Sequence, residues 1–234
     1  MRLSPIPFLF YIMKELSKIA SKYLTDKGVT WFNSHGYTEI YDYYFYKLKS
    51  LNRKINILEI GVQCGYDLDL FNEYFEGNCE IYGFDINLDN YKCEQKDNIH
   101  LFNINASNLN ALSNFYLNNM NFSTCRIPMF DIIIDDGSHI GYEQLTSLSF
   151  LYNKLSKDGF YIIEDLDITR MNDEEIKNSA LWFLNTYKLD NSFNIDLKNV
   201  RDSIKYCNIY HQPNNYEIYI NGCKDSVCAV LKFK

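Results

Sequence analysis

A regular alternation of apolar, β-branched runs with segments of helical periodicity constrains the fold of this chain more than any other feature. The apolar runs occupy residues 55–61, 80–86, 99–104, 130–135 and 159–165. Strands that are apolar along their whole length are typical of a parallel sheet that helices cover on both faces. Residues 67–75 and 142–156 lie between such runs and show helical spacing, and Gly159 is placed to cap the second helix. The pattern predicts an α/β fold with a doubly wound, mostly parallel sheet.

The texture of the sequence changes beyond residue 190. Shorter and more polar runs at residues 203–210, 216–220 and 227–233 are separated by PNN and NG turn signals. Runs of this kind favour antiparallel pairing. We therefore expect an antiparallel C-terminal edge on an otherwise parallel, Rossmann-like sheet.

The N-terminal residues 5–13, PIPFLFYIM, are apolar but too few to span a bilayer. We interpret them as a helix and its lead-in that pack on the domain, and we expect no membrane span. No internal repeat and no linker rich in Gly, Ser or Pro divides the chain. One compact domain is therefore expected, with an N-terminal helical segment over residues 1–50 that covers the ligand site of residues 51–234.

Length and charge narrow the class of ligand. A chain of 234 residues can bury the core of one α/β domain, and its formal net charge is −7 with no run of Lys and Arg. An acidic chain without a basic face is a poor binder of nucleic acid, so small molecules are the expected partners. Seven cysteines without a CxxC pair or zinc spacing indicate reduced thiols in a cytoplasmic protein. The oligomeric state stays open, and a homo-oligomer is compatible with the sequence.

Acidic residues stand where several of the predicted strands end. The clearest case is FDIIIDDGSH, residues 130–139, in which an apolar strand runs into Asp135 and Asp136 and, three residues on, His139. Acids also end the first, second and fifth strands, at Glu59, Asp85, Glu164 and Asp165. Ligands of doubly wound sheets bind beyond the carboxyl ends of the strands. We therefore expect these side chains to meet in one crevice, although each acid alone is also compatible with a helix cap or a solvated loop.

The loop after the first strand, EIGVQCGYD, carries glycines at positions 61 and 65. A dinucleotide-binding loop would read GxGxxG, with a middle glycine that admits the pyrophosphate. Gln63 stands in that place, which disfavours NAD. The loop with its two glycines could also be a simple tight turn, and Asp85 a surface aspartate, without any role in ligand binding. The acid before the loop, the two glycines and Asp85 at the end of the next strand otherwise resemble motifs I and II of class I S-adenosylmethionine (SAM) methyltransferases.

Six segments together resemble the macrocin- and mycinamicin-type sugar O-methyltransferases. In order, they are LTDKG (24–28), HGYTEIYDYYF (35–45), INILEIGV (55–62), IYGFDIN (81–87), FDIIIDDGSH (130–139) and GFYIIEDL (159–166). The likeness covers about residues 23–166, and the rest of the chain carries none.

The resemblance implies roles for the acids at the strand ends. Asp136 and Asp165 would bind Mg²⁺, and His139 would be the general base, with Asp136 also counted in the catalytic group. Mg²⁺ prefers oxygen ligands and is often held by one or two carboxylates, and an imidazole is suited to accept a proton near neutral pH. Glu59 is a third candidate ligand, although in most class I methyltransferases this acid supports the SAM site.

The resemblance also implies a SAM site. Gly61 would let the backbone approach the methionine part, and Asp85 would accept hydrogen bonds from the two ribose hydroxyls. Further candidate cofactor contacts are Glu59, Gly65, Asp135, Asn105, Ser107 and Tyr37. Tyr37 lies in a segment expected to fold over SAM, and Asn105 and Ser107 lie in INASN, where the family tends to have the acidic GDQSD.

The predicted function is SAM-dependent, Mg²⁺-assisted O-methyl transfer to a sugar hydroxyl. The sugar would be nucleotide-activated or glycan-linked, as in polysaccharide biosynthesis. Two alternatives stay open: a methyltransferase for a non-sugar small molecule such as a catechol, and a non-catalytic SAM-fold binding protein.

Overall fold

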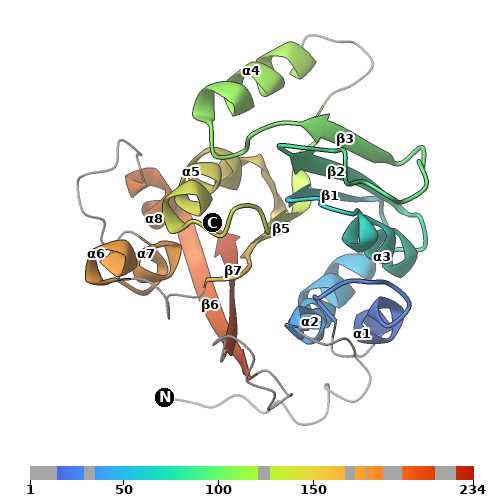
Figure 1. Cartoon of the computed structure of the whole chain (residues 1–234), viewed down its shortest axis with the longest axis horizontal. Coiled ribbons are helices and arrows are strands. Elements are labelled where there is room, and N and C mark those ends of the chain that lie inside the picture. The colour runs from blue at the N-terminus through green and yellow to red at the C-terminus, as the bar shows by residue number, and fades with distance from the viewer. Residues whose placement is uncertain are drawn as a thin grey trace.

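The computed structural model of the chain describes residues 15–28, 35–120, 127–166, 172–177, 179–186, 197–213 and 225–234. Within these residues the core is a seven-stranded sheet in the order β3-β2-β1-β4-β5-β7-β6 (Figure 1). The strands are β1 (Ile55–Ile60), β2 (Cys79–Asp85), β3 (Ile99–Asn103), β4 (Phe130–Asp135), β5 (Leu155–Ile163), β6 (Ile204–Pro213) and β7 (Asp225–Phe233). Strands β1 to β5 pair in parallel, whereas β7 pairs antiparallel with β5 and β6. The predicted fold class, with its antiparallel C-terminal edge, is confirmed.

Helices cover both faces of the sheet. They are α1 (Glu15–Ala20), α2 (Tyr37–Lys49), α3 (Tyr66–Tyr74), α4 (Leu109–Met120), α5 (Gly141–Leu151), α6 (Asp173–Lys177), α7 (Ala180–Thr186), α8 (Lys198–Ser203) and a short 3₁₀ turn, η2 (Tyr152–Lys154). Alternate residues of β4 show the two layers: Ile132 and Ile134 share a buried cluster with α1, α2 and α3, while Ile133 joins α4, α5 and α7 on the other face. A strand buried on both sides has no polar face, which explains its unbroken apolar sequence.

Two details differ from the sequence-based expectation. The helix that begins at Gly141 ends at Leu151, and the predicted cap, Gly159, lies inside β5. Gly159 lies in the stretch where the pairing of β4 with β5 jumps from Phe130–Leu155 to Ile132–Phe160. A Cβ on Gly159 would lie 2.8 Å from the carbonyl oxygen of Phe130, so this glycine serves a bulge and the cap prediction is wrong.

Some expectations fall on residues that the structure does not describe. These are the N-terminal residues 5–13 and the run at residues 216–220. Within the described ranges, no helix combines the length and the apolar character needed to cross a bilayer.

The order of the strands fixes where a ligand can bind. From β1 the chain builds β2 and β3 on one side of the sheet, and it then returns to place β4 and β5 on the other side (Figure 1). The helices that follow β1 and β4 consequently leave on opposite faces, which opens a crevice at the carboxyl ends of these two strands. Ile60 pairs with Asp135 at this edge, so the polar residues that follow both strands meet there.

The N-terminal helices share the core of the strands. Leu16, Ile19 and residues of α2 lie in the same buried cluster as β1 and β2. Asp42 of α2 is 1% exposed and accepts the N–H of Leu16 on Oδ1, at 3.0 Å. Among the described residues its other oxygen has no hydrogen-bond partner, and burial raises the pKa of Asp42 to about 7. The predicted division of the chain at residue 50 stays a prediction.

Asp42 should therefore weaken the fold as the pH rises. Its pKa is higher in the folded state than in the unfolded chain, so the folded state loses stability between about pH 4 and pH 7, by about 1.4 kcal/mol per unit of pKa shift. Asp42→Asn removes this titration. Urea unfolding at several pH values should show the variant gaining stability relative to the unaltered protein as the pH rises. A difference between the two proteins that does not change with pH would contradict the assignment.

Candidate active site

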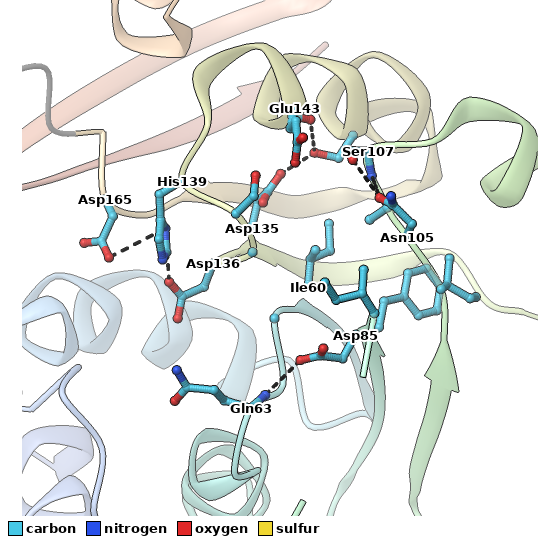
Figure 2. Close-up of a pocket in the computed structure, with 18 of the residues that line it drawn as sticks. Ile60, Gln63, Asp85, Asn105, Ser107, Asp135, Asp136, His139, Glu143 and Asp165 are labelled. Atoms are coloured by element: carbon cyan, nitrogen blue, oxygen red, sulfur yellow. Dashed lines mark hydrogen bonds and ion pairs between the residues drawn. The ribbon is translucent and has the colours of Figure 1, made fainter. Parts of the chain in front are cut away.

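A cavity of about 450 Å³ lies at the carboxyl edge of the sheet. Its lining includes Gly61, Asp85, Asn105, Ser107, Asp135, Asp136, His139 and Asp165. Figure 2 shows Asn105 and Ser107 on one side of the cavity, with Asp85 below them, and His139 and Asp165 on the opposite side. The sheet therefore brings together residues that are up to 104 positions apart, counted from Gly61 to Asp165.

Asp85 holds the loop that follows β1. Its Oδ2 accepts the backbone N–H groups of Val62 and Gln63 at 2.8 and 3.0 Å, and its Oδ1 accepts the N–H of Asn87 at 2.9 Å. A carboxylate offers about four lone-pair positions, so it can still accept a hydrogen bond from a ligand. Asp85 consequently shapes the loop and presents negative charge to the cavity.

Asn105 and Ser107 form a small polar turn after β3. The Ser107 N–H and hydroxyl both donate to Oδ1 of Asn105, at 2.9 and 2.6 Å. This Asx turn keeps both side chains beside the cavity, and it leaves the amide NH₂ of Asn105 as a donor.

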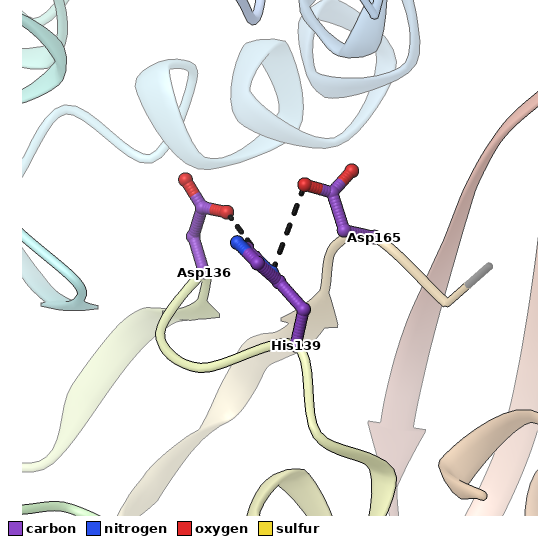
Figure 3. Close-up of side chains that lie close together, drawn as sticks. All are labelled: Asp136, His139 and Asp165. Atoms are coloured by element: carbon purple, nitrogen blue, oxygen red, sulfur yellow. Dashed lines mark ion pairs between the residues drawn. The ribbon is translucent and has the colours of Figure 1, made fainter. Parts of the chain in front are cut away.

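Asp136, His139 and Asp165 form the second polar group of the cavity (Figure 3). Nδ1 of His139 lies 3.9 Å from Oδ1 of Asp136 and 3.7 Å from Oδ2 of Asp165. Each of the three residues offers a ligand atom, and these atoms lie within 4.8 Å of one another. His139 and Asp165 both have positive φ angles, 57° and 51°, a strained conformation that is uncommon outside glycine and concentrates at functional sites.

A second acidic group lies beneath this one, around the ammonium of Lys27. The Lys27 side chain is 0% exposed, and its Nζ donates to Asp136 and, at 2.9 Å, to Glu164. Asp67 and Glu59 lie 3.6 and 3.8 Å from the same nitrogen. Burial lowers the pKa of Lys27, but the surrounding carboxyl groups, Asp136 first, raise it well above its usual value, so Lys27 is charged.

The structure distinguishes between the candidate metal ligands. Asp136, His139 and Asp165 form the rim of the cavity, where none of the three is fully buried. The two carboxylates of the rim suit Mg²⁺, which is often held by one or two carboxylates. The oxygens of Glu59 fall into a different group, with Asp67 and Asp136, that already surrounds the ammonium of Lys27. Burial raises the pKa of Glu59 well above its usual range and that of Asp136 to about 6, so position and not the pKa separates the two: Glu59 is 1% exposed, whereas 18% of the Asp136 side chain is exposed.

Three other predicted contacts lie away from the cavity lining. Tyr37 is buried, and its hydroxyl donates to Oδ1 of Asp165 at 2.6 Å, so it supports a rim residue from below. Gly65 has a φ of 85° at the start of α3, where a Cβ would meet the ring of Tyr91. Glu59 is buried under the rim. As cofactor contacts or metal ligands, all the predicted site residues remain predictions.

Asp135 lies at the edge of the cavity and is tied to the protein. Its Oδ2 accepts hydrogen bonds from the hydroxyls of Ser147 and Tyr161, the latter at 3.3 Å. Burial raises the pKa of Asp135 to about 6, which these donors and the N–H of Gly137 partly oppose. Its main observed contacts therefore join β4 to α5 and β5.

Lys27 is the main residue of this region that the motifs did not single out. It belongs to the LTDKG segment, one of the six segments that carry the family resemblance. Several acids at strand ends with no cation among them are a signal that a buried counter-charge must come from elsewhere.

The strand order and the cavity at its reversal point define the class I methyltransferase fold. The MycE methyltransferase from the mycinamycin biosynthetic pathway, solved in complex with Mg, S-adenosylhomocysteine (SAH) and mycinamycin VI, matches with a TM-score of 0.68. It is 22% identical, and the match covers 94% of this chain and 53% of that one.

The sequence resembles two curated O-methyltransferases. The demethylmacrocin O-methyltransferase of Streptomyces fradiae is 31% identical over 160 residues, and the mycinamicin VI 2''-O-methyltransferase of Micromonospora griseorubida is 30% identical over 164 residues. Each match covers 65% of this chain and 36% of the relative, so the chain spans little more than a third of their length. No protein-family model matches the chain. The resemblance expected from the motifs is confirmed.

The structure explains why residue 61 is a glycine, apart from any contact with a ligand. Gly61 has a φ of 90°, and a Cβ there would lie 2.1 Å from the carbonyl oxygen of Asp136. The missing side chain thus lets the ends of β1 and β4 come together, whatever the cavity holds.

Gly61→Ala should lower the free energy of unfolding more than Gly77→Ala does. Both glycines have positive φ, but a Cβ on Gly77 would meet no atom of the described residues within 4 Å. We expect Gly77→Ala to lower the free energy of unfolding by about 1–2 kcal/mol. Gly61→Ala should cost about 1–3 kcal/mol more, because the backbone must also move. Equal losses in urea denaturation would show that β1 and β4 do not approach as described.

Proposed function

We propose that this chain is a SAM-dependent O-methyltransferase that transfers a methyl group to a sugar hydroxyl. The observation that carries the proposal is the meeting of Asp136, His139 and Asp165 at one side of a cavity that Asp85 lines. Methyl transfer to a hydroxyl needs a base beside that hydroxyl, and two carboxylates there can hold a metal ion. Binding of SAM needs polar groups along the cofactor, and Asp85 is one of them.

The order of residues along the cavity supports the cofactor assignment. Asn105 and Ser107, which lie near Asp85 in Figure 2, would contact the adenine, and Asp85 would accept the ribose hydroxyls. Gly61, which also lines the cavity, would lie beside the methionine part. SAM, when bound, supplies a methyl group on a sulfonium, which is already an activated electrophile. The acidic lining also suits the positive charge of that sulfonium.

The opposite side of the cavity would bind the acceptor. A sugar hydroxyl is a weak nucleophile, so the protein must align its oxygen and remove its proton. His139, which is 43% exposed on its side chain, can accept that proton on a ring nitrogen. Asp136 and Asp165 would hold Mg²⁺ with their carboxylates, and the ion, when bound, would supply a Lewis acid that orients neighbouring hydroxyls and raises their acidity. The imidazole stays free as the base, because Mg²⁺ prefers oxygen ligands.

The relatives support a sugar as the acceptor. Two of them are named for demethylmacrocin and mycinamicin VI, and a third is named as a 3'-O-methyltransferase of a 2-methoxy-alpha-L-rhamnosyl tetracenomycin. We extend this only to the class of acceptor: a nucleotide-activated or glycan-linked sugar, in a cytoplasmic step of carbohydrate or polysaccharide biosynthesis.

Asp85→Asn should weaken SAH binding. The change removes the charge that would accept the ribose hydroxyls, and hydrogen bonds to charged groups contribute about 1.5–3 kcal/mol, so the Kd should rise about tenfold or more. Asp89→Asn is the control, because Asp89 is exposed on the loop that follows β2 and does not line the cavity. Calorimetry that finds the same SAH affinity in both variants would reject the role of Asp85.

His139→Gln should lower methyl transfer by about 10²–10⁴-fold with little change in SAH affinity, because it removes the base. His100→Gln is the matched control, since His100 pairs with Glu80 away from the cavity. The assay screens nucleotide sugars, glycosides and catechols with labelled SAM, with and without a chelator. Turnover of catechols alone would show that the acceptor is a catechol and not a sugar. Full activity in the presence of the chelator would show that the reaction needs no metal ion.

A further inference from the structure

The two aspartates of the rim are each held from below by the N-terminal part of the chain. Oδ2 of Asp136 accepts a hydrogen bond from Lys27, while its Oδ1 faces His139 at 3.9 Å. Oδ1 of Asp165 accepts the hydroxyl of Tyr37 at 2.6 Å, while its Oδ2 faces His139 at 3.7 Å. Each carboxylate thus has one oxygen tied down and the other turned toward the cavity.

We propose that Lys27 and Tyr37 are positioning residues, which fix Asp136 and Asp165 so that one oxygen of each faces His139 and a bound metal ion. This inference rests on the proposed function and extends it to residues that would touch neither substrate nor cofactor. Partners that orient metal ligands in this way typically change metal affinity by 10- to 100-fold when they are removed.

Stability alone is a weak explanation for these contacts. A fully buried lysine loses its hydration, and the attraction of its partners often does no more than offset that loss. Well-packed apolar side chains would serve the core equally well. The buried ammonium instead links four segments through Glu59, Asp67, Asp136 and Glu164. Of these four, Asp136 is the acid that also reaches the rim group with His139 and Asp165.

Charge and orientation predict opposite results for Lys27, which makes the test informative. Loss of the ammonium removes a positive charge that repels a metal ion, and this effect alone would strengthen metal binding. Loss of the hydrogen bond frees Asp136 to rotate, which weakens metal binding. Tyr37→Phe removes one hydroxyl and no charge, so it isolates orientation.

The experiment measures Mn²⁺ binding by electron paramagnetic resonance in the presence of saturating SAH. Lys27→Met should weaken Mn²⁺ binding about 10- to 100-fold and Tyr37→Phe about tenfold, while SAH affinity stays near that of the unaltered protein. The first control is Lys22→Met, because the ammonium of Lys22 is exposed and pairs with Glu73. The second control is Tyr44→Phe, because Tyr44 lies on α2 like Tyr37 and its hydroxyl shares a hydrogen bond with Tyr210 of β6. Both controls should bind Mn²⁺ normally.

Unchanged or tighter Mn²⁺ binding in Lys27→Met together with unchanged binding in Tyr37→Phe would overturn the proposal. If Lys27→Met does not fold, Lys27→Gln and Tyr37→Phe carry the same test. An unaltered protein that binds neither SAH nor Mn²⁺ would refute the proposed function instead. The positioning roles are then decided by crystal structures: Asp136 and Asp165 should turn in the variants and keep their orientation in the controls, and unmoved aspartates would overturn the proposal.

Discussion

The site depends on the ammonium of Lys27, because the fold withdraws several carboxyl groups from water at one edge of the sheet. Glu59 and Glu164 are buried, and Asp136 is mostly covered, with 18% of its side chain exposed. Negative charges this close cannot all persist without a cation, so some of these groups take up protons and the rest pair with the ammonium. Burial raises the pKa of Glu59 well above its usual range and that of Asp136 to about 6, and the attraction of Lys27 opposes both shifts. The same contact attaches the N-terminal part of the chain to the ends of β4 and β5.

Sheet topology supplies the rest of the arrangement. Since β1 and β4 are neighbours while their connections leave on opposite faces, the loops that follow them leave a crevice between them. Asp85 arrives at this crevice from β2, and Asp165 arrives from β5. A cavity lined by residues from several strands therefore follows from the strand order, before any particular ligand is considered.

Much of this could be predicted from the sequence, for physical reasons. The apolar runs located the strands because central parallel strands need apolar residues on both faces, and β4 was predicted to the residue. The acids at strand ends could be grouped because parallel strands share one carboxyl edge. Gly159 was misassigned because the same residue suits a helix cap and a strand bulge. Sequence periodicity could not predict the role of Lys27 or the burial of Tyr37, because both depend on how a segment distant in the sequence packs on the folded sheet.

The central claim is that a methyl donor and a metal ion share this one cavity, and paramagnetic relaxation tests it most directly. SAM bound to the protein would be observed by NMR through its S-methyl protons while Mn²⁺ is added. The account predicts strong broadening of that signal. In a variant that carries both Asp136→Ala and Asp165→Ala, the broadening should disappear and the methyl signal should stay sharp. Tight binding of both SAM and Mn²⁺ without any broadening of the methyl signal would place the two ligands in separate parts of the molecule and contradict the account.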